Sequence, residues 1–133
     1  MEHHERPGEG KYLSLTSYRR DGTPVATPVW FVTENGRLLV STDAGSYKVK
    51  RIRRNPTVAI AACTASGRLR GETVEARAEI LPDSEGQHVD TLMKRKYRID
   101  RILVLPLYRA VIRVRHRQQP EGKPAYLAIT PLG

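Results

Sequence analysis

The sequence predicts a mainly β protein of the α+β class, a small barrel of six or seven antiparallel strands with two or three inserted helices. Three observations lead to this fold class. Apolar and polar residues alternate over several short segments, tight-turn dipeptides join some of these segments, and stretches with helical spacing interrupt the series. The 133 residues suit one domain, expected over 11–133 after a flexible tail, Met1–Gly10.

Alternation predicts three strands in the first third of the chain. Lys11–Tyr18 alternates cleanly, and Asp21-Gly22 then predicts a hairpin turn because both residues tolerate a positive φ. Thr23–Thr33 is the expected second strand. Asn35-Gly36 is a stronger hairpin signal and leads into a third strand, Arg37–Thr42. We therefore expect a meander at the start of the barrel.

A short amphipathic helix is predicted next, over Ser46–Arg54. Val49 and Ile52 lie three residues apart and would share its apolar face, with basic residues around them. Ser46 offers a capping hydroxyl at the start. Asn55-Pro56 ends the helix, because the residue before a proline avoids the helical region.

The second half of the chain predicts three more strands and a longer helix. Thr57–Thr64 is β-branched and alanine-rich, and Glu72–Leu81 alternates clearly. Acidic residues after Pro82 favour a helix that continues to about Arg98, and Ala125–Thr130 closes the series as a strand. Asp100–Gln118 fits a helix or a strand, and we favour a helix.

The composition of the chain indicates in which compartment the protein is located and which kinds of partner it binds. The formal net charge of +9 favours anionic partners: nucleic acid, anionic membranes or polyanionic small molecules. The basic stretches lack interleaved aromatic residues, so no nucleic acid is expected. One cysteine, Cys63, forms no internal disulfide, and no signal peptide or membrane-spanning run is visible. A cytoplasmic protein is expected, and no histidine or cysteine spacing indicates a metal.

The predicted helix carries the chemistry of a phosphate site. Its N-terminus offers unpaired N–H groups and a partial positive charge, to which Ser46 adds a hydroxyl. Lys48 and Arg51 share one face, and Lys50 lies on another. Cations in a first helical turn are unfavourable unless an anion lies beside them, although a solvated basic helix accounts for the pattern about equally well.

The second strand could contact a planar ring. Pro24 and Pro28 free its backbone from ladder hydrogen bonds on one side, so polar backbone groups could face a ligand. Thr27 could add a hydroxyl contact. Trp30 could stack on the ring, although a lone tryptophan more often lies in a core or an interface.

Together these segments resemble the pyridoxamine-phosphate-oxidase-like split β-barrel superfamily. Within it, the sequence is most similar to the flavin/deazaflavin oxidoreductases that use the deazaflavin coenzyme F420. The resemblance covers about Lys11–Leu81 and rests on the motifs Gly22-Thr23-Pro24-Val25-Ala26-Thr27-Pro28-Val29-Trp30-Phe31, Gly36, Val40-Ser41-Thr42, Ser46 and Lys48-Val49-Lys50-Arg51-Ile52-Arg53-Arg54-Asn55-Pro56.

The resemblance implies a homodimer that binds its cofactor at the subunit interface and transfers a hydride from the reduced cofactor to a small organic acceptor. Carried over by position, the cofactor-binding residues are Thr27, Pro28, Val29, Trp30, Ser41, Thr42, Ser46, Lys48, Lys50, Arg51, Ala61, Ala62 and Cys63. The phosphate would lie at Ser46, Lys48 and Arg51. No residue is predicted to catalyse the reaction itself, since the cofactor supplies the chemistry. The alternatives are an FMN-binding protein of the same fold, and a non-enzymatic basic protein that binds nucleic acid or a membrane surface.

Overall fold

A computed structural model describes residues 6–97 and 123–132. In chain order the elements are β1 (Tyr12–Tyr18), β2 (Pro24–Trp30), β3 (Val32–Glu34), β4 (Arg37–Asp43), α1 (Tyr47–Arg54), β5 (Thr57–Cys63), β6 (Val74–Leu81), the 3-10 turn η1 (Asp83–Glu85), α2 (Gly86–Lys96) and β7 (Pro124–Pro131). The mainly β, α+β prediction is confirmed, with seven strands in the described part of the chain.

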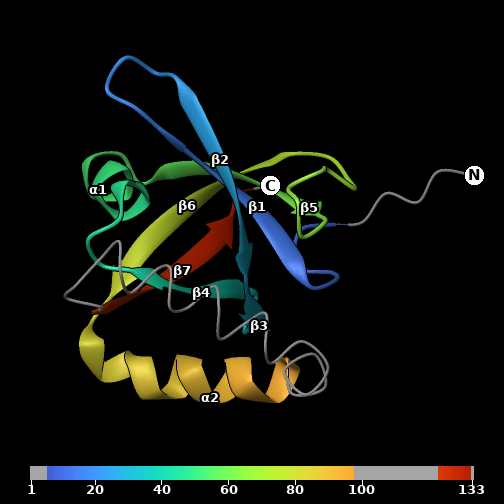
Figure 1. Cartoon of the computed structure of the whole chain (residues 1–133), viewed down its shortest axis with the longest axis vertical. Helices are drawn as coiled ribbons and strands as arrows, with labels where there is room; N and C mark the ends of the chain where they lie inside the picture. Colours follow the sequence, from blue (N-terminus) through green and yellow to red (C-terminus); the bar gives the residue numbers. More distant parts are fainter. Residues whose placement is uncertain (1–5, 98–122, 133) are drawn as a thin grey trace, which may run out of the picture.

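The strands form one antiparallel sheet in the order β2-β1-β5-β6-β7-β4-β3. β2 and β3 therefore lie at opposite ends of the hydrogen-bonded order, although Phe31 alone separates them in sequence. This connection curls the sheet into the barrel seen in Figure 1. The single second strand predicted over Thr23–Thr33 is wrong in this respect, because the chain leaves one edge and joins the other at Phe31.

The inner face of the barrel is the main core. Cross-strand partners share a face, so Leu15 on β1 lies beside Thr27 on β2 and Ile60 on β5. The buried cluster built on this face consists of Ile52 of the helix α1 together with Leu13, Leu15, Val29, Phe31, Leu38, Val40, Val58, Ile60, Ala76, Ala78, Leu127 and Ile129. The alternation predicted for β1 and β6 is thus confirmed.

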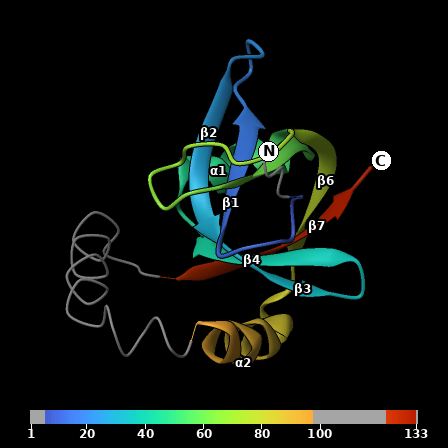
Figure 2. The same cartoon turned by 90° about the vertical axis from the view of Figure 1, so that its right-hand side faces the viewer.

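A second, smaller core lies on the outer face, under α2. Val32, Leu39 and Ala128 line the sheet side of this core, and Val89 of α2 is fully buried against them. Figures 1 and 2 show α2 across the β3–β4–β7 end of the barrel, while α1 lies on another side, near the β1–β2 hairpin. The two helices therefore cover different parts of the molecule.

The two predicted hairpin turns differ. Asn35 (φ 53°) and Gly36 (φ 78°) both adopt left-handed conformations, as a two-residue turn between twisted strands requires. In the other turn only Gly22 has a positive φ (89°), and β1 and β2 are separated by residues 19–23. Asp21 instead accepts a hydrogen bond from the Thr23 N–H, at 2.9 Å, so its role is that of a turn-capping side chain.

Two sequence predictions lie wholly or partly outside the described residues. The segment Asp100–Gln118, expected to be a helix, falls within 98–122. Of the tail predicted over Met1–Gly10, the structure describes only Arg6–Gly10.

Candidate functional site

Helix α1 begins as the sequence predicted. Ser46 is its N-cap in extended conformation, and its Oγ accepts a hydrogen bond from the Val49 N–H at 3.3 Å. Val49 and Ile52 are buried, which fixes the helix on the barrel. Asn55 ends the helix, and its Oδ1 accepts a bond from the Thr57 N–H, so the strand β5 follows at once. The first turn contains no acidic residue.

The cations of α1 divide between two environments. Lys48 and Arg51 are half-buried on one face, whereas Lys50, Arg53 and Arg54 are exposed. The Nε of Arg51 donates to the Oγ of Ser17 at 2.7 Å, and Ser17 is itself completely buried on β1. The side chain of Arg51 is thus directed to the barrel wall rather than out into solvent.

Among the residues that the structure describes, the charges that act on Arg51 are of the same sign. Burial lowers the pKa of the Arg51 guanidinium, and the neighbouring Arg19 and Arg54 lower it further by repulsion. Among the described residues, no carboxylate contributes to this pKa shift. An anion beside these groups would relieve the repulsion, so the arrangement suits an anionic ligand.

Strand β2 is the edge strand that its prolines predicted. It pairs with β1 on one side only in the sheet order, and Pro24 and Pro28 lie opposite Tyr18 and Ser14. A proline nitrogen cannot donate to a ladder, so these residues occupy positions whose nitrogen faces away from β1. The free side of β2 lies near β4 across the barrel.

The predicted cofactor-binding residues outside α1 lie on both faces of the sheet. From the register and the alternation, the inner face carries Thr27, Val29, Thr42 and Ala62, and the outer face carries Pro28, Trp30, Ser41, Ala61 and Cys63. Ala62 and Cys63 are buried, and so is Val29, so these three offer a ligand little side-chain surface. Burial also raises the pKa of the Cys63 thiol, which disfavours a reactive thiolate.

One of these residues has an unused polar atom. The Oγ1 of Thr27 is buried and has no hydrogen-bond partner among the described residues. Buried hydroxyls are nearly always paired, so an unpaired one calls for a ligand, a water or another part of the chain. Thr27 is the residue that the sequence already suggested as a hydroxyl contact.

Tyr97 holds Trp30 and the joint beside it, and the sequence analysis missed this role. The Tyr97 ring stacks on the Trp30 ring, with centroids 4.6 Å apart and planes 12° apart. Its hydroxyl accepts from the Phe31 N–H at 3.0 Å and lies 2.8 Å from the Phe31 carbonyl and 2.7 Å from the Lys11 carbonyl. The backbone groups freed where β2 ends and β3 begins are therefore satisfied by one buried side chain. The buried aromatic at the end of a helical pattern was visible in the sequence, but its partners 66 and 86 residues away were not.

Lys96 supports the same joint. Its Nζ donates to the Phe31 carbonyl at 2.9 Å and lies 3.4 Å from the centroid of the Phe31 ring. Burial lowers the pKa of this ammonium to about 8, because the ring and the barrel wall remove water from it.

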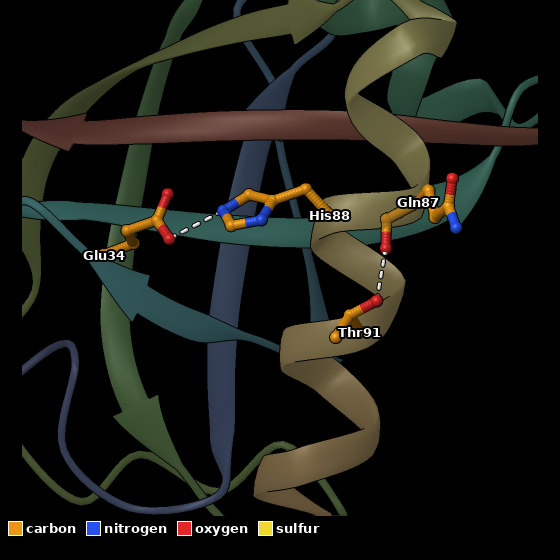
Figure 3. Close-up of polar contacts among 4 residues, drawn as sticks. All are labelled: Glu34, Gln87, His88 and Thr91. Atoms are coloured by element: carbon orange, nitrogen blue, oxygen red, sulfur yellow. Dashed lines mark hydrogen bonds and ion pairs between the residues drawn. The ribbon is translucent and has the colours of Figure 1, made fainter.

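Polar side chains of α2 form hydrogen bonds with polar side chains of the sheet. Figure 3 shows His88 of α2 directed at Glu34 of β3, with Nε2 and Oε2 2.6 Å apart, and Thr91 donating to the Gln87 carbonyl within the helix. The Tyr126 hydroxyl donates to Asp90 at 2.9 Å. Burial first, then the bond to Asp90, raises the pKa of Tyr126 to about 12, so it remains a donor at neutral pH.

A cleft of about 470 Å³ opens between α2 and β7, away from the predicted cofactor site. Its lining is mixed in charge and includes Asp83, Asp90, Lys94, Lys123 and Tyr126. None of the predicted cofactor-binding residues lines this cleft. We therefore place the candidate site at α1 and β2, on the chemistry of the residues rather than on the size of the hollow.

Two further classes of site find no support in residues 6–97 and 123–132. No group of three metal-ligating side chains comes together there. No helix in these ranges is both long and apolar enough to cross a bilayer.

Comparison with solved structures bears out the fold. The chain is similar to a conserved hypothetical protein from Mycobacterium tuberculosis (21% identity, TM-score 0.64, covering 95% of this chain and 76% of the other). It is also similar to an F420 reductase (20% identity, TM-score 0.57, covering 97% of this chain and 90% of the other). A third similar structure is an FAD-binding protein from Mesorhizobium loti (18% identity, TM-score 0.54, covering 93% of this chain and 81% of the other). No curated protein matches the sequence. The family model described as pyridoxamine 5'-phosphate oxidase matches residues 2–126. The chain therefore belongs to the pyridoxamine 5'-phosphate oxidase family.

Proposed function

We propose that the protein is an oxidoreductase that uses the deazaflavin coenzyme F420 to reduce a small organic acceptor. The observation that carries the proposal is the half-buried Arg51 in the last turn of α1, which Arg19 and Arg54 repel, on a helix whose first turn has no acid. A bound phosphate would turn this repulsion into attraction. The similarity to an F420 reductase over most of both chains favours this coenzyme among the flavin-type cofactors.

The residues present fit such a cofactor. Ser46, Lys48 and Arg51 would hold its phosphate, with Thr42 and the more exposed Lys50 close by. The unpaired Thr27 Oγ1 would bind a polar atom of the ring, and Trp30, held by Tyr97, would lie against it. The bound cofactor would supply the hydride, and the chain would orient the ring and exclude water from it.

A homodimer with the cofactor between its subunits is part of the proposal. The predicted residues lie on both faces of the sheet, with Thr27 inside and Pro28, Trp30 and Ser41 outside. A ligand that contacts both groups is more easily accommodated if the second group comes from another copy of the chain. A cytoplasmic location, where reduced cofactors are supplied, agrees with the single free cysteine.

The test is a titration of the protein with F420, followed by fluorescence quenching. We expect binding, and expect the double variant Lys48→Ala, Arg51→Ala to lose at least about a hundredfold in affinity, since charge-assisted hydrogen bonds to a phosphate contribute about 1.5–3 kcal/mol each. Arg53→Ala with Arg95→Ala removes the same charge from exposed positions and should bind normally. Equal losses in the two double variants would mean that net charge alone attracts the coenzyme.

FMN is the second candidate, and the similarity to an FAD-binding protein favours it. A titration with FMN under the same conditions separates the two, because only the cofactor that the site fits should saturate at equimolar amounts. If neither cofactor binds and duplex DNA binds with a steep dependence on salt, the proposal fails in favour of a non-enzymatic basic protein.

A further inference from the structure

Three arginines meet at the end of strand β1, and two of them are fixed there by hydrogen bonds. Arg51 donates to Ser17 at 2.7 Å, and Arg54 donates through Nη2 to the Tyr18 carbonyl at 3.1 Å. Arg19 is the next residue along the chain. Its own backbone closes the turn, since its N–H donates to the Thr23 carbonyl and its carbonyl accepts from Gly22, both at 2.9 Å. The arginine cluster Arg19, Arg51 and Arg54 is therefore assembled from two separate segments.

Among residues 6–97 and 123–132, no carboxylate forms an ion pair with Arg19, Arg51 or Arg54. Arg19 and Arg54 both act on Arg51 as repelling charges. The hydrogen bonds from Thr23 and the charge of Arg19 lower the pKa of Asp21, so Asp21 offsets part of the charge of Arg19, but it does not contribute to the pKa shift of Arg51. A fixed set of like charges costs stability, and such a set persists most readily where an anion compensates it.

We propose that the arginine cluster at the end of β1 binds the phosphoryl group of a small phosphorylated ligand, independently of hydride transfer. Guanidinium groups present paired donors that match phosphate oxygens, and three of them suit a group with two or more negative charges. A phosphoryl group at the end of a phosphate chain carries that charge in a compact volume, whereas a nucleic-acid phosphodiester carries one.

The proposal goes beyond the cofactor site but shares Arg51 with it. The variants therefore change Arg19 and Arg54, which have no place in the proposed cofactor set, and the probes contain no flavin. A protein that fails to bind F420 can still pass this test, and one that binds F420 can still fail it.

The experiment measures binding of pyrophosphate by isothermal titration calorimetry at constant ionic strength. We expect the double variant Arg19→Gln, Arg54→Gln to weaken binding at least about tenfold. The matched control is the double variant Arg20→Gln, Arg53→Gln. Arg20 follows Arg19 in the turn between β1 and β2, and Arg53 precedes Arg54 in α1. The affinity of this control for pyrophosphate should stay within about twofold of wild type. Arg54→Lys keeps the charge but loses the guanidinium, so we expect intermediate binding.

Two further arms identify the source of the phosphoryl group. If ADP binds about as tightly as pyrophosphate, the site recognises the phosphate chain alone. If ADP binds at least about tenfold more tightly, the natural ligand is a nucleotide. Both outcomes support the cluster as the site. The unfolding temperature of each variant without ligand shows whether it folds. The proposal is overturned if pyrophosphate does not bind, if the control pair weakens binding as much as the test pair, or if duplex DNA binds more tightly than pyrophosphate with equal dependence on all four arginines.

Discussion

The two helices of this barrel meet the sheet in opposite ways. At the α2 side, polar groups are matched: Tyr97 with Phe31, Tyr126 with Asp90 and His88 with Glu34. At the α1 side, Arg51 faces other arginines, and its helix starts without an acid. Both sides bury apolar residues well, so the difference lies in charge and not in packing.

The comparison leads to opposite expectations for substitutions on the two sides. A side that satisfies its own hydrogen bonds should lose stability when any partner is removed. A side that accumulates like charges should gain stability when a charge is removed or countered, because the repulsion between the charges is then relieved. The predictions below test this contrast from the largest expected effect to the smallest.

Tyr97→Phe should be the most damaging change, at about 2–3 kcal/mol. The ring still stacks on Trp30, but the Phe31 N–H loses its acceptor in a buried place, and an unsatisfied buried group costs about 1–3 kcal/mol. Urea unfolding followed by the fluorescence of Trp30, the only tryptophan, measures the loss. Tyr47→Phe, on a side chain 75% exposed, is the control and should change the free energy of unfolding by less than about 0.5 kcal/mol. Equal effects in both variants would contradict the role of Tyr97 at the joint.

Gly86→Ala should destabilise the protein by about 1–2 kcal/mol, because a β-carbon there would lie 2.4 Å from Cε2 of Tyr126. The backbone of Gly86 is helical, so the cost comes from the close approach and not from its φ. Gln87→Ala, one residue later on the exposed side, should be close to neutral. Thermal unfolding compares the two, and a neutral Gly86→Ala would mean that α2 shifts easily on the sheet.

Tyr47→Glu should stabilise the protein by about 0.5 kcal/mol. It adds the missing acid to the first turn of α1, where it favours the helix dipole and faces Lys50 and Arg51 at helical spacing. Tyr47→Gln removes the ring without adding charge and serves as the control. The same variant should weaken anion binding, which calorimetry with pyrophosphate would detect. A stabilisation that is the same for both variants would show that charge is not the cause.

Lys96→Met should change the pH dependence of stability by a small amount. The folded protein releases the Lys96 proton at about pH 8 and the unfolded chain at about pH 10.5, so between these values the unfolded state binds more protons and stability rises with pH. Met keeps the contact with the Phe31 ring but removes this rise. We therefore expect the free energy of unfolding of the wild type, minus that of the variant, to increase between pH 8 and pH 10. Parallel curves would contradict the lowered pKa.

Local features were predictable from the sequence because local rules govern them. The Asn35-Gly36 turn, the cap at Ser46 and the end of α1 at Asn55 follow from backbone preferences of single residues. The alternation of β6 follows from the periodicity of its apolar residues.

The arrangement of the site was less predictable, because it depends on pairings between distant segments. At the connection between β2 and β3, the Phe31 N–H donates to the hydroxyl of Tyr97, 66 residues away in sequence. Arg51 donates to Ser17, 34 residues away. The sequence also placed neighbouring residues such as Ser41 and Thr42 in one site, although alternation directs them to opposite faces of β4. The spacing of a motif thus identifies the participants of a site better than their directions.

The prolines of β2 also govern how copies of this chain can meet. A free strand edge normally offers a row of donors and acceptors on which another strand can grow. Pro24 and Pro28 remove two donors from that row in seven residues, so a continuous intermolecular sheet cannot propagate along this side. We therefore expect copies of the chain that meet on this side to do so through side chains rather than through continuous strand pairing.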